Sequence, residues 1–176
     1  LPGMFLGLVI APIFTKRFDS KTVFIGGRIF GVIVDVVFFF AGFENVGLTM
    51  FLYSLTSIPL GISSVVSGTM VTTTIDYAEW KFGNRQEGLI SSTQTLTAKI
   101  GMALSAGVTG LVLEMANYVP NQVTSETQMM IHGAFTLFCA VIGVLAIIPM
   151  LFNKVTDKEH ARIVAELAER KKQQEQ

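Results

Sequence analysis

The chain has 176 residues, of which 51% are apolar and 15% charged, and its 13 Lys+Arg balance its 13 Asp+Glu. Soluble domains devote about a quarter of their residues to charge, so this composition and a mean hydropathy of +0.56 exclude an ordinary soluble domain and indicate a membrane protein. The zero net charge gives no sign of a nucleic-acid partner, and the single cysteine, Cys139, excludes an intramolecular disulfide and a cysteine-based metal site.

The chain opens on an apolar run, without an initiating Met or the charged segment that begins a signal peptide. We therefore expect the C-terminal piece of a longer protein. Residues 4–14 are apolar and compatible with a helix, but a spanning helix needs roughly 20 residues. The abrupt start favours a spanning helix cut at its N-terminal end, and the alternative is an interfacial or re-entrant segment.

Residues 23–43 form a second apolar segment, which contains two charges. Arg28 and Asp35 are seven residues apart, so they share one side of a helix about two turns from each other. A charge near the middle of a membrane costs about 2.5 to 3.5 kcal/mol on insertion scales, so we expect Asp35 to face the bundle interior, water or a partner. Asp35 is either a substrate- or cation-binding group or half of a structural ion pair with Arg28 or a helix outside the chain.

Residues 46–75 follow without a single charge and are more numerous than a straight spanning helix needs. Pro59 and Gly61 near the middle predict a kink or break. From Asp76 onward the sequence is dense in charge, and this stretch separates two apolar segments. We expect it to be a water-facing hinge between two membrane helices.

The next predicted span, residues 89–115, has a polar beginning. Ser92, Thr95 and Lys99 follow a helical spacing and stack on one side of the helix. A helix that faced only lipid would exclude such groups, so we expect something other than lipid against this side. The small residues that continue the same stripe predict a seam for close helix packing; they are Ala103, Ala106, Gly107 and Gly110.

Lys99 is the most informative residue of this helix. About ten residues past the hinge and at ~1.5 Å rise per residue, it lies about 15 Å into the membrane. The alternative, a side chain that snorkels to the surface, is disfavoured at this depth. Lys99 is therefore a candidate binding group, because a desolvated lysine is a strong donor.

Residues 129–152 form the last predicted span, and residues 153–176 form a charged tail with a narrow apolar stripe, which we expect to be a solvated surface helix. Taking the loops alternately, all Lys and Arg fall on one side, and the turns near Glu44 and Tyr118 have none. The positive-inside rule then predicts five crossings, the first one truncated, with the hinge and the C-terminus in the cytoplasm. The predicted fold is an all-α membrane bundle over residues 1–152.

The hinge and the helix after it resemble a known family. The residues that carry the resemblance are Asp76-Tyr77-Ala78-Glu79-Trp80-Lys81, Gly83, Arg85, Glu87, Gly88, Ser92-Thr93-Gln94-Thr95 and Lys99. They are similar to the loop between helices ten and eleven of the glycoside-pentoside-hexuronide:cation symporters, which belong to the major facilitator superfamily. Tyr118-Val119-Pro120-Asn121 is similar to the outward turn that follows, so the signature covers roughly residues 70–125.

The resemblance implies a twelve-helix carrier of the cell membrane, of which this chain supplies part of the eighth helix and all of the last four. It implies import of a sugar or glycoside with H+ or Na+ by alternating access, with no cofactor besides the coupling cation. It also implies that the site is completed by the missing N-terminal part of the same chain. The residues that match family positions are Gln94, Thr95 and Lys99, near sugar and cation, and Asp76, Tyr77, Glu79 and Arg85, at the cytoplasmic gate.

Asp35 and Arg28 match no motif of the family, so the place of Asp35 among the binding candidates depends on the membrane argument alone. Two alternatives stay open: a facilitator-type carrier of a lysolipid or other amphiphile, and a membrane scaffold subunit that transports nothing. An enzyme is not expected, because His, Ser and Cys do not occur at catalytic or metal-ligand spacing and a Gly-rich phosphate loop is missing.

We predict that the 176 residues alone do not transport, because a facilitator site forms between two halves of the bundle. The measurement is accumulation of labelled sugar by vesicles that contain only this chain. Robust accumulation would contradict the prediction.

Overall fold

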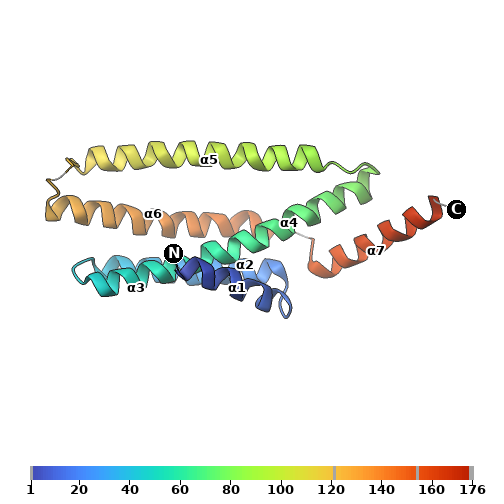
Figure 1. The fold of residues 1–176 in the computed structure, drawn as a ribbon, viewed down its shortest axis with the longest axis horizontal. Coiled ribbons are helices and arrows are strands. Elements are labelled where there is room, and N and C mark those ends of the chain that lie inside the picture. The colour runs from blue at the N-terminus through green and yellow to red at the C-terminus, as the bar shows by residue number, and fades with distance from the viewer. Residues whose placement is uncertain (1, 121, 154, 175–176) are drawn as a thin grey trace.

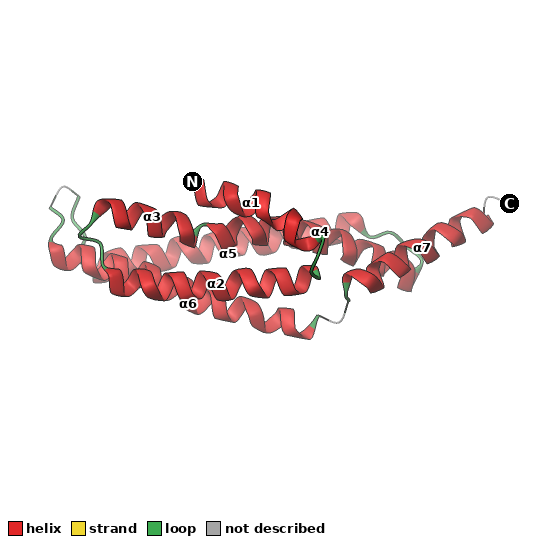
Figure 2. Ribbon diagram, turned by 90° about the horizontal axis from the view of Figure 1, so that it is seen from below, coloured by secondary structure: helices red, strands yellow, loops and turns green. Residues whose placement is uncertain are grey.

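In a computed structural model of the chain, residues 2–120, 122–153 and 155–174 are described, and all regular structure within them is α-helical (Figure 2). The predicted all-α fold class is therefore confirmed. The helices are α1 (Pro2–Thr15), α2 (Ser20–Ala41), α3 (Val46–Thr56), α4 (Ile58–Phe82), α5 (Glu87–Met115), α6 (Ser125–Phe152) and α7 (Asp157–Gln174). Figure 1 shows α1 to α6 extended along one long axis, with α7 at one end.

Four runs are long and apolar enough to cross a membrane: α2, the run Val46–Phe82 that joins α3 and α4, α5 and α6. The helix α1 is a shorter apolar helix of 14 residues. Each predicted span overlaps one of these helices. The core lies where α1, α2, α4 and the end of α6 meet, and its buried residues are Ala11, Val23, Ile62, Val66 and Met150.

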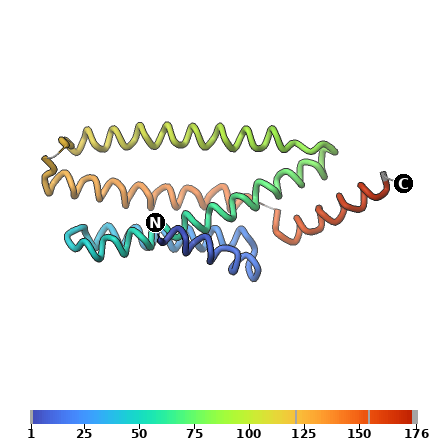
Figure 3. Tube along the Cα trace, viewed as in Figure 1, coloured from blue at the N-terminus to red at the C-terminus, as the bar shows by residue number. Residues whose placement is uncertain are grey.

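The long third run is interrupted at Ser57, close to the proline that predicted a break. Pro59 lies in the first turn of α4, where its missing N–H would have no intrahelical partner in any case. The hydroxyls of Thr56 and Ser57 donate to the carbonyl of Tyr53 at 3.0 and 2.8 Å. The chain continues past this break in roughly the same direction, as the tube in Figure 3 shows.

The predicted water-facing hinge is mostly helix, which corrects the expectation that the loop begins at Asp76. The helix α4 continues to Phe82, so only four residues, 83–86, connect it to α5. Gly83 ends α4 with a left-handed φ of 75° and donates its N–H to the carbonyl of Glu79 at 2.9 Å, as glycine commonly does at a helix end. The charged residues that were assigned to a loop therefore have fixed positions on a helix.

The helices α1 and α4 pack closely through glycines. A Cβ at Gly61 would overlap the carbonyl of Met4 and lie 2.8 Å from the nitrogen of Leu8, and a Cβ at Gly7 would overlap the carbonyl of Ile58. Small residues allow this kind of approach between membrane helices. The seam predicted on residues 103–110 of α5 is not used within this chain, since a Cβ at Gly107 or Gly110 would have nothing within 4 Å.

The charged tail is docked on the bundle, which corrects the expectation of a solvated end. In α7, Ile163 is only 1% exposed and Leu167 9%, whereas Val164 is 44% exposed. These two buried side chains are one helical turn apart, and α7 packs against α4. The apolar stripe noticed in the sequence is therefore a packing face.

Hydrogen bonds fix the beginning of α7 to the turn between α1 and α2. The carboxylate of Asp157 accepts from the backbone N–H of Ser20 at 2.8 Å and from its hydroxyl at 2.9 Å. The N–H of Asp157 in turn donates to Asp19 Oδ1 at 2.8 Å. The helix α7 thus connects the start of α2 to the end of α4.

We predict that Gly61→Ala destabilises the bundle by about 1 to 3 kcal/mol, the usual cost of overpacking, because the new methyl group would meet the backbone of α1. The matched control is Gly68→Ala on the same helix, where a Cβ has nothing within 4 Å. Detergent-induced unfolding followed by circular dichroism measures both. Equal stability of the two variants would contradict the account of the seam.

We predict that Ile163→Asp releases α7, because an unpaired carboxylate cannot remain in the buried position. Amide hydrogen exchange within α7 should become about tenfold faster or more, since exchange reports local opening. The same substitution at Val164 is the control and should leave exchange nearly unchanged. Fast exchange in the unmodified chain would show that α7 is not docked.

Candidate functional site

The polar side of α5 is continuous but has little contact with the rest of the chain. No residue of α5 is buried, although the helix is described over its full length. Gln94, Thr95 and Lys99 are exposed. Figure 1 shows α5 as the outermost helix, beside α6 and away from α1 to α3. The predicted binding side of α5 therefore faces outward from this chain.

The hydroxyls of α5 are satisfied by their own helix. Thr95 Oγ1 donates to the carbonyl of Ser91 at 2.9 Å, and Thr97 Oγ1 donates to that of Thr93 at 2.8 Å. Such bonds use the hydroxyl hydrogen and leave the oxygen free to accept from a ligand. Lys99, about 18 Å along the helix axis from Glu87 at ~1.5 Å per residue, is exposed and makes no hydrogen bond or ion pair with the described residues, so its ammonium still needs acceptors.

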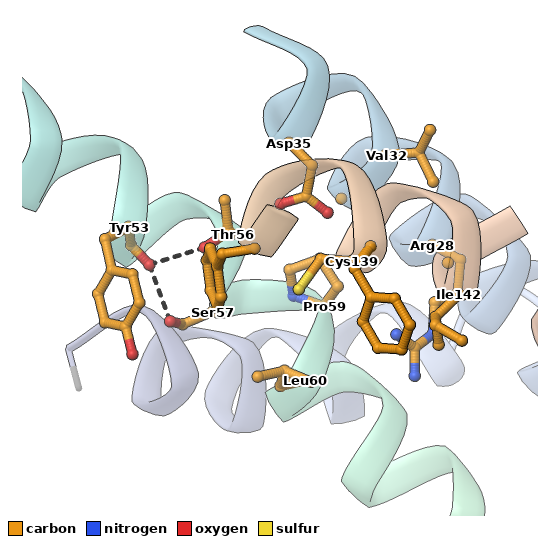
Figure 4. Close-up of a pocket in the computed structure, with 14 residues that line it drawn as sticks. Arg28, Val32, Asp35, Tyr53, Thr56, Ser57, Pro59, Leu60, Cys139 and Ile142 are labelled. Atoms are coloured by element: carbon orange, nitrogen blue, oxygen red, sulfur yellow. Dashed lines mark hydrogen bonds between the residues drawn. The ribbon is translucent and has the colours of Figure 1, made fainter. Parts of the chain in front are cut away.

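Asp35 is not brought together with the α5 residues. It lines a cavity of about 270 Å³ that is bounded by α2, the α3–α4 break and α6, and none of the lining residues comes from α5. Figure 4 shows the carboxylate of Asp35 pointing into this space, above Pro59 and Cys139. The predicted binding residues therefore form two separate places.

Arg28 lines the same cavity, but the ion pair considered for it is not formed. Among the described residues, no salt bridge joins Arg28 and Asp35, and both Arg28 Nε and Asp35 Oδ1 are buried without a hydrogen-bond partner. Two turns of helix separate their Cα atoms, about 10.5 Å along the axis. Sharing one side of a helix did not bring the two charges into contact.

Three of the four predicted gate residues form one ionic cluster. Arg85 Nη1 lies 3.2 Å from Asp76 Oδ1 and 2.8 Å from Glu79 Oε2, and Arg85 Nε pairs with Glu87. Hydrogen bonds from Arg85 to Glu79 and then to Glu87 raise the pKa of Arg85 above its ordinary value, so it stays a cation. This arrangement fixes the short α4–α5 connection against the end of α4.

Tyr77 lies outside this cluster. Its ring packs against Trp80, with centroids 5.9 Å apart, and Lys81 Nζ lies 5.7 Å from the ring centroid. Tyr77 also lines a smaller polar cavity together with residues at the start of α2 and of α7. The predicted gate set is therefore divided between ionic and aromatic contacts.

The tail helix α7 contributes partners of the predicted gate residues that the sequence did not indicate. His160 Nε2 lies 2.9 Å from Asp76 Oδ2, and Lys171 Nζ lies 2.9 Å from Glu79 Oε1. Trp80 Nε1 donates to Glu166 Oε2 at 2.6 Å. The only sequence signal was the Ile163 and Leu167 spacing, which indicated an apolar side without naming its partner.

Comparison with known proteins identifies the family of the chain. The family described as MFS/sugar transport protein matches residues 1–157. The chain is 34% identical over 93% of its length to an uncharacterized symporter, YjmB, of Bacillus subtilis. It is 29% identical over 100% of its length to a glucuronide carrier protein homolog of Escherichia coli, and 30% identical over 94% to a raffinose carrier protein of Pediococcus pentosaceus.

The chain spans 36%, 39% and 27% of the lengths of these three relatives. They are named as carriers or symporters and not as enzymes, and the matched family consists of transporters. The apolar helices, the α4–α5 signature and these matches together identify a multi-pass membrane protein. The chain belongs to the MFS/sugar transport protein family, as a member of the glycoside-pentoside-hexuronide:cation symporters of the major facilitator superfamily.

Proposed function

We propose that this chain forms the C-terminal helices of a secondary active transporter that imports a sugar or glycoside with H+ or Na+ by alternating access. The observation that carries the proposal is the exposed polar side of α5, with Ser92, Thr95 and Lys99, beside which Gln94 is also exposed. Polar groups of a spanning helix are costly in lipid and normally line a pathway or meet other protein groups. The greater length of the relatives supports further helices opposite this side.

Gln94, Thr95 and Lys99 each have a distinct role in this proposal. Thr95 already donates to the carbonyl of Ser91, so its oxygen accepts a hydrogen bond from a sugar hydroxyl. Gln94 both donates and accepts. Lys99 donates to sugar oxygens or pairs with an acidic group, either of the substrate or of the helices that complete the site.

The ionic cluster at the end of α4 is proposed as the gate on the cytoplasmic side. Arg85 holds Asp76 and Glu79 on one side, and His160 and Lys171 hold the same two carboxylates on the other. Access from the cytoplasm requires α4 and α5 to separate from the helices that face them. This cluster, which lies within α4, the α4–α5 connection and α7, holds the ends of α4 and α5 together during that movement. The concentration of Lys and Arg at this end supports the cytoplasmic orientation of the gate and of the C-terminus in the cell membrane.

The relatives and Lys99 support the proposed substrate class. One relative is named for a glucuronide, which carries a carboxylate, and another for raffinose, which is neutral. A lysine on the pathway is compatible with both, because an ammonium donates to hydroxyl oxygens and pairs with carboxylates. We therefore propose a sugar or glycoside and leave its charge to experiment.

We predict that Lys99→Ala in the complete gene product lowers uptake of a labelled sugar about tenfold or more, since a charge-assisted hydrogen bond contributes about 1.5 to 3 kcal/mol. The control is Lys158→Ala, an exposed lysine of α7, which should transport normally. Transport assays in cells, with expression checked by immunoblotting, measure both variants.

Unchanged sugar uptake by Lys99→Ala would remove Lys99 from the site. If the unmodified protein moves no sugar but accumulates a labelled lysolipid, the amphiphile carrier is the correct alternative. If neither solute is moved, a scaffold role replaces the proposal.

A further inference from the structure

The cavity between α2, the α3–α4 break and α6 lies apart from the polar side of α5. It measures about 270 Å³, the volume of about nine water molecules at ~30 Å³ each. This matches one sugar ring and not an oligosaccharide. Figure 4 shows side chains from all three elements around this one space.

Arg28 and Asp35, which carry opposite charges, both line this cavity but form no salt bridge with each other. Asp35 is 7% exposed, and its Oδ1 and the Nε of Arg28 are buried without partners among the described residues. Burying a charged group without hydrogen bonds costs several kcal/mol. The two groups therefore favour an occupant that accepts from one of them and donates to the other.

The rest of the lining fits the same kind of occupant. The hydroxyls of Thr56 and Ser57 both donate to the carbonyl of Tyr53, so their oxygens can still accept hydrogen bonds from a ligand. The rings of Tyr53, Phe135 and Phe138 also line the cavity. A mostly apolar wall with a few placed polar groups is typical of small-molecule sites.

Charge balance selects among possible occupants. Arg28 and Asp35 contribute one positive and one negative charge, and Cys139 and Tyr53 are the other titratable groups in the lining. A lone cation or proton at Asp35 leaves Arg28 uncompensated, and a lone anion at Arg28 leaves Asp35 uncompensated. A neutral polyol satisfies both at once, because its hydroxyls donate to the carboxylate and accept from the guanidinium.

We propose that this cavity is a second sugar site, which binds a neutral monosaccharide-sized polyol between Asp35 and Arg28. This proposal rests on the proposed function and extends it by naming a neutral ligand. Binding at this cavity does not itself require transport. The site differs from the α5 side in its elements, its charges and its enclosure.

The test is equilibrium dialysis of the complete gene product with Lys99→Ala, which weakens the proposed α5 site, in lipid nanodiscs against radiolabelled methyl β-D-glucopyranoside. We expect saturable binding that Asp35→Asn and Arg28→Gln each weaken about tenfold, the effect of losing one charge-assisted hydrogen bond. Glu44→Gln, at an exposed carboxylate outside the cavity, is the matched control and should bind normally.

Cys139 gives a second measurement that does not depend on removing a charge. It is the only cysteine and lines the cavity, so the bound glycoside should slow its alkylation by a small neutral maleimide. Cys139→Phe should abolish binding by filling the space while leaving both charged residues in place.

Three results would overturn the proposal. They are no saturable binding of the glycoside, binding that survives both Asp35→Asn and Cys139→Phe, and binding of labelled Na+ in place of the sugar. Lys99 does not line this cavity, so the two experiments are independent. A negative binding result would not affect the uptake test of Lys99, and a negative uptake result would not affect the binding test.

Discussion

The hydrocarbon of a bilayer offers no hydrogen-bond partner, and this constraint organises the whole chain. Helices satisfy their backbones internally, and the hydroxyls of α5 do the same with their own carbonyls. Lys99, Arg28 Nε and Asp35 Oδ1 have no hydrogen-bond partner among the described residues. Their positions therefore mark the surfaces that need water, ligand or further protein, one on the outer side of α5 and one between α2 and α6.

The helix α4 connects three features of the structure. It begins at the break that borders the Asp35 cavity, packs closely on α1 at Gly61 and ends in the cluster around Arg85. The C-terminal end of α4 is also held by α7, whose own start is bound to the beginning of α2. A change of angle at Ser57 would therefore also move the charged end of α4.

Hydropathy was sufficient to predict the helices, and Pro59 was sufficient to predict the break, because both signals are local. The end of α4 was misjudged because charge was taken to mean loop, whereas the helix continues until Gly83 can end it. The sequence also could not show which glycines pack against another helix. Small residues occur on both α4 and α5, and only the neighbouring helices determine which of them form a contact. The same reason hid the contact of His160 with Asp76, which are 84 positions apart.

The central claim is that the polar side of α5 lines an aqueous passage at the depth of Lys99. The most direct measurement uses the complete gene product with its native cysteines, Cys139 among them, replaced by serine and with Ala103→Cys, one turn from Lys99 on the same side of α5. The variant is labelled in cells by a membrane-impermeant thiol reagent with and without sugar. The account predicts labelling in water-accessible states and protection by the transported sugar. Labelling by lipid-soluble reagents alone, unaffected by sugar, would contradict it.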